Sequence, residues 1–168
     1  MRERWREVTT AQFLSFTVVV GAFGWWLATD ADGFIPVLDH ANQWIHKAGH
    51  LVSELGLPGF TLYAGVTAQL LVPLLATIGL WKEAATLPCA IGGIWLSENL
   101  LNLAAYIADA GTKQMPMMGG PHHEWEEIFA RFGVTSPPAE VAFWPWVAGW
   151  AGIVVAWLWI ARRWWRSR

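Results

Sequence analysis

The stretch FTLYAGVTAQLLVPLLATIGLW, residues 60–81, contains no charged side chain. As a helix it would rise about 33 Å, which is enough to cross the hydrocarbon core of a bilayer. Three more apolar runs have comparable length: AQFLSFTVVVGAFGWWLA (11–28), AATLPCAIGGIWLSENLLNLAAYIA (84–108) and VAFWPWVAGWAGIVVAWLWIA (141–161). We therefore expect four transmembrane helices, one at each of these runs.

The composition agrees with an integral membrane protein. The chain has 168 residues, of which 55% are hydrophobic and only 14% are charged, whereas soluble domains carry about 25% charged residues. The 14 tryptophans also fit, because tryptophan is enriched where membranes meet water. We expect an all-α fold, with residues 1–168 forming a single membrane-embedded domain in the lipid bilayer. One cysteine excludes a disulfide framework, and the absence of a basic stripe with interleaved aromatics predicts no nucleic-acid partner.

The distribution of positive charge predicts the sidedness. Arginines cluster before the first run and after the last, and Lys82 lies in the short turn between the second and third. These places hold eight of the 11 lysines and arginines, and basic residues favour the cytoplasmic side. Both termini are therefore expected in the cytoplasm, which requires an even number of crossings. The longer segments 29–59 and 109–140 then lie outside.

The outer segment 29–59 contains DHANQWIHKAGHLVSELG, residues 39–56. Since a fifth crossing would break the even number, we expect segment 34–55 to be an interfacial or re-entrant helix. His46 and His50 are four residues apart, so on a helix they point the same way and can clamp one metal ion. The alternative is that both are ordinary residues of a polar helix face.

Other polar residues are expected near these histidines. Glu98, Asn102, Tyr106 and Asp109 follow one face of the third run, and Asp109 reaches its outer end, where a carboxylate could serve as a third ligand. The alternative is that this face only joins helices by hydrogen bonds.

A second group of histidines follows in GGPHHEWEE. Either His122 or His123 could reach the metal, and His40 is a further candidate; the alternative is an exposed loop.

Taken together, four motifs resemble a known family. HANQWIHKAGHLV (40–52), AGVTAQLLVPLL (64–75), YIADAGTKQMPMMGG (106–120) and HHEW (122–125) occur in the order found in small bacterial multi-pass membrane proteins related in motif to site-2-protease-like metallopeptidases. The resemblance covers about 100 residues of this sequence. It implies a bacterial inner-membrane protein with a metal site, and it implies zinc because zinc is the metal of that family.

The resemblance implies that His46 and His50 are metal ligands and that Asp109 and His123 complete the site. It also implies a loss of catalysis. The general-base glutamate of the H-E-x-x-H motif is replaced by Lys47, and an ammonium group has no lone pair with which to accept a proton. The family's H-D-W is H-E-W here, which keeps a carboxylate at Glu124.

Three functions remain open at this point. The first is a non-catalytic, pseudoenzyme-like accessory or scaffold subunit that joins other membrane-protein subunits, with Gly149 and Gly152 permitting close helix approach. The second is an active membrane-embedded zinc hydrolase in which Glu98 or Glu124 acts as the base. The third is a haem or chlorophyll binder with His46 or His50 as axial ligand.

Overall fold

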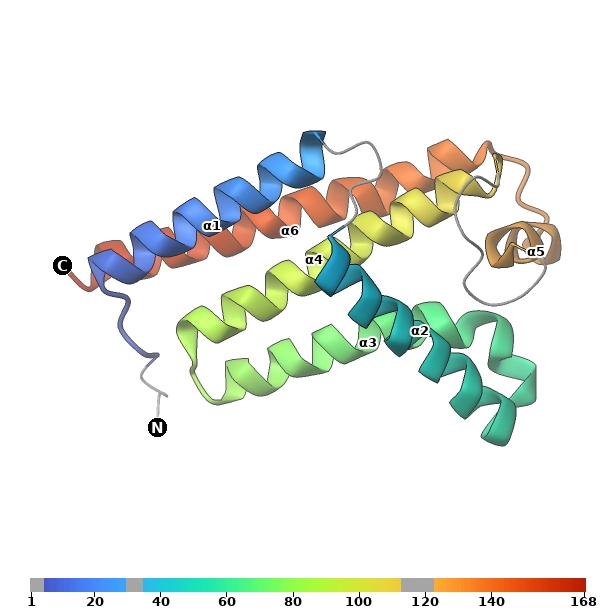
Figure 1. Ribbon diagram of the computed structural model, residues 1–168, viewed down its shortest axis with the longest axis horizontal. Coiled ribbons are helices and arrows are strands. Elements are labelled where there is room, and N and C mark those ends of the chain that lie inside the picture. Colours follow the sequence, from blue (N-terminus) through green and yellow to red (C-terminus); the bar gives the residue numbers. More distant parts are fainter. Residues whose placement is uncertain (1–4, 30–34, 113–122) are drawn as a thin grey trace.

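The computed structural model describes residues 5–29, 35–112 and 123–168 (Figure 1). Within these ranges every regular element is a helix: α1 (Thr10–Thr29), α2 (Pro36–Gly56), the short 3-10 helix η1 (Pro58–Phe60), α3 (Thr61–Lys82), α4 (Thr86–Asp109), α5 (Glu124–Phe132) and α6 (Pro138–Arg166). The prediction of an all-α fold is confirmed for this part of the chain. The four apolar runs fall on α1, α3, α4 and α6, and the histidine segment falls on α2.

Three of the described helical stretches are long and apolar enough to cross a membrane: α1, Pro58–Lys82 and α6. Their outward surfaces are apolar as well, for example at Val18, which is 70% exposed, and Val155, which is 62% exposed. Such surfaces suit lipid rather than water, so the helices indicate a membrane protein. Helix α4, with Glu98 and Asn99 near its middle, falls outside this group, and its crossing belongs to the proposal below.

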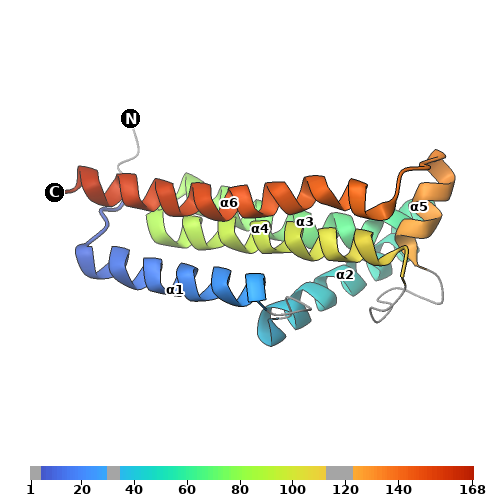
Figure 2. The ribbon, with the colours of Figure 1, turned by 90° about the horizontal axis from the view of Figure 1, so that it is seen from above.

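The longest helices form an antiparallel core. Helices α4 and α6 lie side by side, and α1 follows the C-terminal part of α6 (Figures 1 and 2). The α1–α6 register is marked by two tryptophans, because the indole N–H of Trp157 donates to Thr17 Oγ1 at 3.1 Å and that of Trp164 donates to Thr10 Oγ1 at 3.2 Å. Helices α2 and α3 form a hairpin that packs on α4, and α5 lies near one end of the bundle.

Small residues allow α4 and α6 to approach closely. A Cβ on Gly152 would lie 2.2 Å from Ser97 Oγ, and one on Gly149 would lie 2.8 Å from the Ser97 carbonyl oxygen. These two glycines, which the sequence offered for contact with other subunits, are therefore covered by α4 of the same chain.

The two chain ends meet at one end of the bundle. Ser167 Oγ donates to the Val8 carbonyl at 3.2 Å, and the Arg6 N–H donates to the Ala84 carbonyl at 3.1 Å, so the α3–α4 turn lies there too. Helix α5 and the α2–α3 connection lie toward the opposite end (Figures 1 and 2). Whether these two ends face opposite sides of a membrane stays a prediction.

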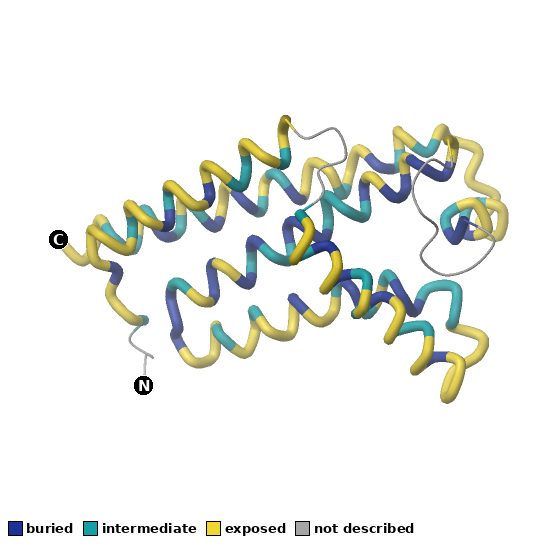
Figure 3. The backbone as a smooth tube through the Cα atoms, viewed as in Figure 1, coloured by how far each residue is buried: buried dark blue, intermediate teal, exposed yellow. Residues whose placement is uncertain are grey.

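Many apolar residues are exposed on the outside of the bundle, and several polar side chains are buried beside the apolar core. Buried positions of α2, α3 and α4 gather where these helices meet (Figure 3). They include Asn42, His46, Gln69, Glu98 and Asn99. Because burying polar groups is costly, such groups mark a place where function or helix specificity requires them.

Candidate metal centre

Helix α2 turns one polar face toward the bundle. It begins at Pro36, where the missing N–H of proline costs no helical hydrogen bond. Asp39, Asn42, His46 and Ser53 are buried, and spacings of three, four and seven residues place them on one face of the helix. The prediction that His46 and His50 share a helix face is confirmed. Whether α2 lies on the membrane surface or dips into it stays a prediction.

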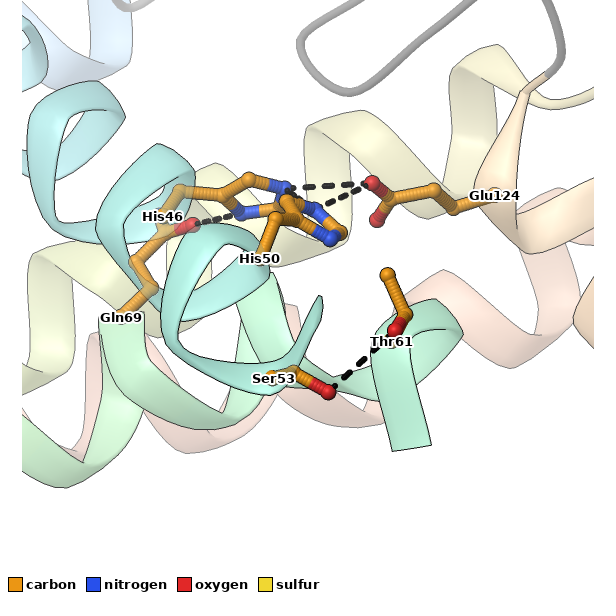
Figure 4. Close-up of polar contacts among 6 residues, drawn as sticks. All are labelled: His46, His50, Ser53, Thr61, Gln69 and Glu124. Atoms are coloured by element: carbon orange, nitrogen blue, oxygen red, sulfur yellow. Dashed lines mark hydrogen bonds and ion pairs between the residues drawn. The ribbon is translucent and has the colours of Figure 1, made fainter. Parts of the chain in front are cut away.

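Three ligand atoms converge at this face (Figure 4). His46 Nε2 and His50 Nε2 lie 3.1 Å apart, and Glu124 Oε1 lies 3.3 Å from the first and 2.8 Å from the second. The three residues form a group that could hold a metal ion. His46 is fully buried, and Glu124 is 6% exposed.

The spacing suits one tetrahedral ion. Zinc binds nitrogen and oxygen ligands at about 2.0–2.1 Å, so two ligand atoms of a tetrahedral zinc site lie about 3.4 Å apart. The three observed separations, 2.8, 3.1 and 3.3 Å, are close to this value. Three protein ligands would leave the fourth position open.

Hydrogen bonding at His46 orients its second nitrogen for a cation. His46 Nδ1 lies 3.1 Å from Gln69 Oε1, and an N–H at Nδ1 donates to this oxygen. In the neutral ring, Nε2 is then an acceptor, and it faces Glu124 Oε1, which is also an acceptor. A cation between them relieves this contact, and the Gln69 contact is the kind that orients metal-bound histidines.

Gly65 on α3 forms the floor of the site. A Cβ at this position would lie 2.4 Å from Nε2 of both His46 and His50. Only glycine therefore leaves room for the two rings in this arrangement, which gives the glycine of the AGVTAQLLVP motif a direct role in the site.

Glu124 is the first residue of α5, a short helix that was not predicted from the sequence. Its local signals are three glutamates in the first turn, Arg131 in the last turn, and Gly133 with φ 63° immediately after the helix. Acidic residues at the start, basic residues at the end and a left-handed glycine after the helix all favour this structure. Because Trp125 and Phe129 pack on α4 and α6, α5 holds Glu124 over α2.

The remaining predicted ligands lie beside this group. His123 Nε2 is 3.6 Å from Asp109 Oδ2, and both residues are buried. The Tyr106 ring lies between this pair and the site, with its centroid 4.4 Å from that of His123 and 6.4 Å from that of His46. Asp109 and His123 as ligands stay a prediction. His122, Gly119 and Gly120 lie outside the described residues.

Lys47 lies outside the buried face of α2. Its side chain is exposed, and Nζ is 5.8 Å from the centroid of the Trp44 ring. The residue that replaces the expected glutamate is thus directed toward Trp44. His40 is exposed as well, and it contacts the Pro36 carbonyl oxygen.

A buried carboxylate–amide network fixes α2 against α4. Asn42 Nδ2 donates to Glu98 Oε2 at 2.8 Å, and the Trp95 indole N–H donates to Asn42 Oδ1 at 2.8 Å. Asn102 Nδ2 donates to Glu98 Oε1 at 2.7 Å and to Asp39 Oδ1. The sequence left two roles open for the polar face of α4, metal binding and the joining of helices by hydrogen bonds. Glu98 and Asn102 have the second role, because they bond to Asn42 and Asp39 of α2.

Comparisons with protein-family models, with curated proteins and with solved structures found no match. The resemblance to site-2-protease-like metallopeptidases therefore stays a prediction from sequence motifs. The fold and the site define a coarser class: a protein that is helical over its described residues, with membrane-type helices and a largely buried group of two histidines and one glutamate that could hold a metal ion.

Proposed function

We propose that this chain is a multi-pass membrane protein that binds one zinc ion through His46, His50 and Glu124 and does not hydrolyse a substrate. The observation that carries the proposal is the convergence of three ligand atoms with tetrahedral spacing, from the buried residues His46 and Glu124 and the half-buried His50. Glu124 Oε2 adds support, since this buried oxygen has no hydrogen-bond partner among the described residues. A bound cation would compensate the buried carboxylate.

The absence of catalysis follows from the positions of the candidate bases. Lys47 replaces the general base and is directed toward Trp44. Glu98 accepts hydrogen bonds from Asn42 and Asn102 within the network between α2 and α4. Glu124 is needed as a ligand. The metal would therefore act as a clamp between α2 and α5 rather than as the activator of a water molecule.

A clamp of this kind suits an accessory or scaffold subunit. It would hold a rigid surface at the α5 end of the bundle, where α6 also exposes large apolar side chains. Phe143, Trp144 and Trp146 are 52%, 72% and 50% exposed, respectively. Aromatic side chains of this kind are enriched at interfaces between proteins and at membrane surfaces. Other membrane-protein subunits are the proposed partners.

For location we propose the inner membrane of a bacterium, with four crossings and both termini in the cytoplasm. Helix α4 would be the fourth crossing, since it packs against α3 and α6, two of the apolar helices. Tryptophans gather at the terminal end, where the ring centroid of Trp5 lies 4.7 Å from that of Trp81 and 5.0 Å from that of Trp159. With Trp144 and Trp146 at the other end of α6, they would form two interfacial belts.

An active zinc hydrolase is the second candidate. It is favoured by the open fourth position of a three-ligand site, which could take a water molecule or a substrate carbonyl. It would require a proton acceptor other than Lys47, and Glu124 could serve only by giving up its place as a ligand.

The first prediction tests the metal itself. Protein purified in mild detergent without chelators is expected to contain about one zinc per chain by elemental mass spectrometry. His46→Ala/His50→Ala is expected to lose it, because two of three ligands are removed. Glu124→Gln should bind far more weakly, since an amide oxygen is a poor zinc ligand.

His40→Ala is the matched control, because His40 is exposed on the same helix. It should retain the zinc of the wild-type protein. A metal-free wild type that stays metal-free after dialysis against zinc would refute the site, as would a double variant that keeps its zinc.

The second prediction separates the two candidate functions. Neither the wild type nor Lys47→Glu is expected to show zinc-dependent hydrolysis of a fluorogenic membrane-anchored peptide, because position 47 is exposed and lies outside the buried face of α2 that carries His46. Lys47→Gln is the control for charge loss. Chelator-sensitive hydrolysis by the wild type or by Lys47→Glu would contradict the non-catalytic assignment and favour the hydrolase.

A further inference from the structure

An apolar groove lies between α1 and α4, away from the metal centre. Its volume is about 560 Å³. The walls include Phe16, Val19, Val20 and Phe23 from α1 and Ile91 and Ile94 from α4. The polar groups of the lining are few, at Gln12, Ser15 and Trp95, so most of the wall would contact a hydrocarbon.

The position of the groove limits what can fill it. Helix α1 forms one wall, and both α1 and its neighbour α6 are apolar enough to cross a membrane. The groove would therefore lie at bilayer depth, where the surrounding medium is made of acyl chains rather than water. A 20-residue helix with a diameter of about 10 Å occupies about 2,400 Å³, several times the groove volume. A single linear hydrocarbon chain is the occupant of suitable width.

The ends of the groove differ in polarity. At the end away from the termini it meets Leu38 and the ring of Trp95, whose N–H is already bonded to Asn42. At the terminal end it meets Leu87 and Gln12, and the Gln12 amide oxygen accepts the Thr9 N–H at 2.9 Å. The Gln12 amide oxygen and the Trp95 N–H are thus engaged within the protein, and between the two ends Ser15 is the one polar residue of a mostly apolar lining.

A basic residue stands at the terminal end. The Arg6 N–H donates to the Ala84 carbonyl at 3.1 Å, and Thr86 Oγ1 donates to the Arg6 carbonyl, so the backbone of Arg6 is tied to the residues that immediately precede Leu87. The Arg6 side chain is exposed. Guanidinium groups bind phosphate by charge-assisted hydrogen bonds.

We propose that the groove between α1 and α4 binds one acyl chain of an anionic phospholipid whose phosphate pairs with Arg6. This lipid site is separate from the metal centre. The phosphate of the bound lipid would lie at the terminal end of the bundle, beside Arg6.

The test uses full-length protein in vesicles of phosphatidylcholine that contain a minor fraction of phosphatidylglycerol with a photoactivatable group midway along one acyl chain. After illumination, peptide mass spectrometry is expected to place adducts on the groove-facing residues of α1 and α4. Adducts spread evenly over the outward faces of α1 and α6, or chain-to-chain crosslinks through the groove residues, would overturn the proposal.

Two neighbouring valines provide a matched pair of variants. Val19 lines the groove and is 64% exposed, whereas Val18 is 70% exposed and is not part of the lining. Because both side chains are largely exposed, either can become tryptophan without disturbing the core. Val19→Trp is expected to reduce the groove adduct several-fold, and Val18→Trp should leave it unchanged. Equal adduct yields in the two variants would overturn the proposal.

The charge of the head group is tested separately. Arg6→Gln is expected to lower the adduct yield with labelled phosphatidylglycerol to that obtained with the same label on phosphatidylcholine. If the wild type labels equally with both lipids, or if Arg6→Gln retains a preference for phosphatidylglycerol, the role of Arg6 is refuted.

Discussion

Replacement of Gly65 by alanine is expected to abolish zinc binding while leaving the helical bundle folded. The added Cβ would lie 2.4 Å from Nε2 of both His46 and His50, well inside van der Waals contact. The rings must then move, and a shift of either nitrogen breaks the three-atom geometry. Overpacking of this kind costs about 1–3 kcal/mol of unfolding free energy. Zinc content and zinc affinity, measured by elemental mass spectrometry and isothermal titration, give the readout.

Gly79→Ala is the matched control for this variant. Gly79 is on the same helix, and nothing lies within 4 Å of the Cβ that would be added there. It should keep full zinc content and gain up to about 1 kcal/mol from better helix propensity. A Gly65→Ala protein that binds zinc as tightly as Gly79→Ala would show that the histidine rings do not occupy these positions in the metal-bound protein.

Replacement of Glu98 by leucine is expected to lower the free energy of unfolding by more than the same replacement of an exposed glutamate does. Glu98 is buried and accepts hydrogen bonds from Asn42 and Asn102, so its loss deprives buried amide groups of an acceptor. Each such loss costs about 1–3 kcal/mol, which predicts a total of about 2–6 kcal/mol for the two hydrogen bonds. Thermal unfolding in detergent, followed by circular dichroism, measures the effect.

A double-mutant cycle with Asn42→Leu tests whether the network is the cause. Removing both partners leaves fewer unpaired groups, so the double variant should be more stable than the sum of the single changes predicts. Glu54→Leu provides the control, because Glu54 is exposed on α2; its effect should stay within about 0.5 kcal/mol. Additive effects of Glu98→Leu and Asn42→Leu would rule out the network as the source of stability.

The Gly65 and Glu98 variants both affect the buried face of α2, the first through His46 and the second through Asn42. Asn42 and His46 are both on the buried face of α2, one bonded to α4 and the other to Gln69 of α3. The network thus sets the position of α2, and that position decides whether the histidines meet Glu124. Glu98→Leu is accordingly expected to weaken zinc binding as well, although Glu98 is not part of the ligand group.

Much of the fold follows from local patterns in the sequence. Long apolar runs predicted α1, α3, α4 and α6 to within a few residues, because a helix is the only structure of that length that satisfies its own backbone hydrogen bonds in lipid. The shared direction of His46 and His50 was equally predictable, since a separation of four residues is a local property of one helix.

The third member of the site required the tertiary structure. The sequence motifs indicated Asp109 and His123 as metal ligands and Glu124 only as a substitute base. In the structure Glu124 meets the histidines, while Asp109 and His123 contact each other. Residue 124 lies 78 positions after His46, so its place depends on how α5 packs through Trp125 and Phe129, and helical periodicity carries no information about that packing.

Local spacing and composition were enough to predict the helices, their membrane-type surfaces and the shared direction of the two histidines. The room that Gly65 leaves for the histidine rings, the packing of Gly149 and Gly152 against α4, and the groove between α1 and α4 became visible in the tertiary structure alone. These features arise where side chains from distant segments meet, and their distances are set by packing between helices rather than within one.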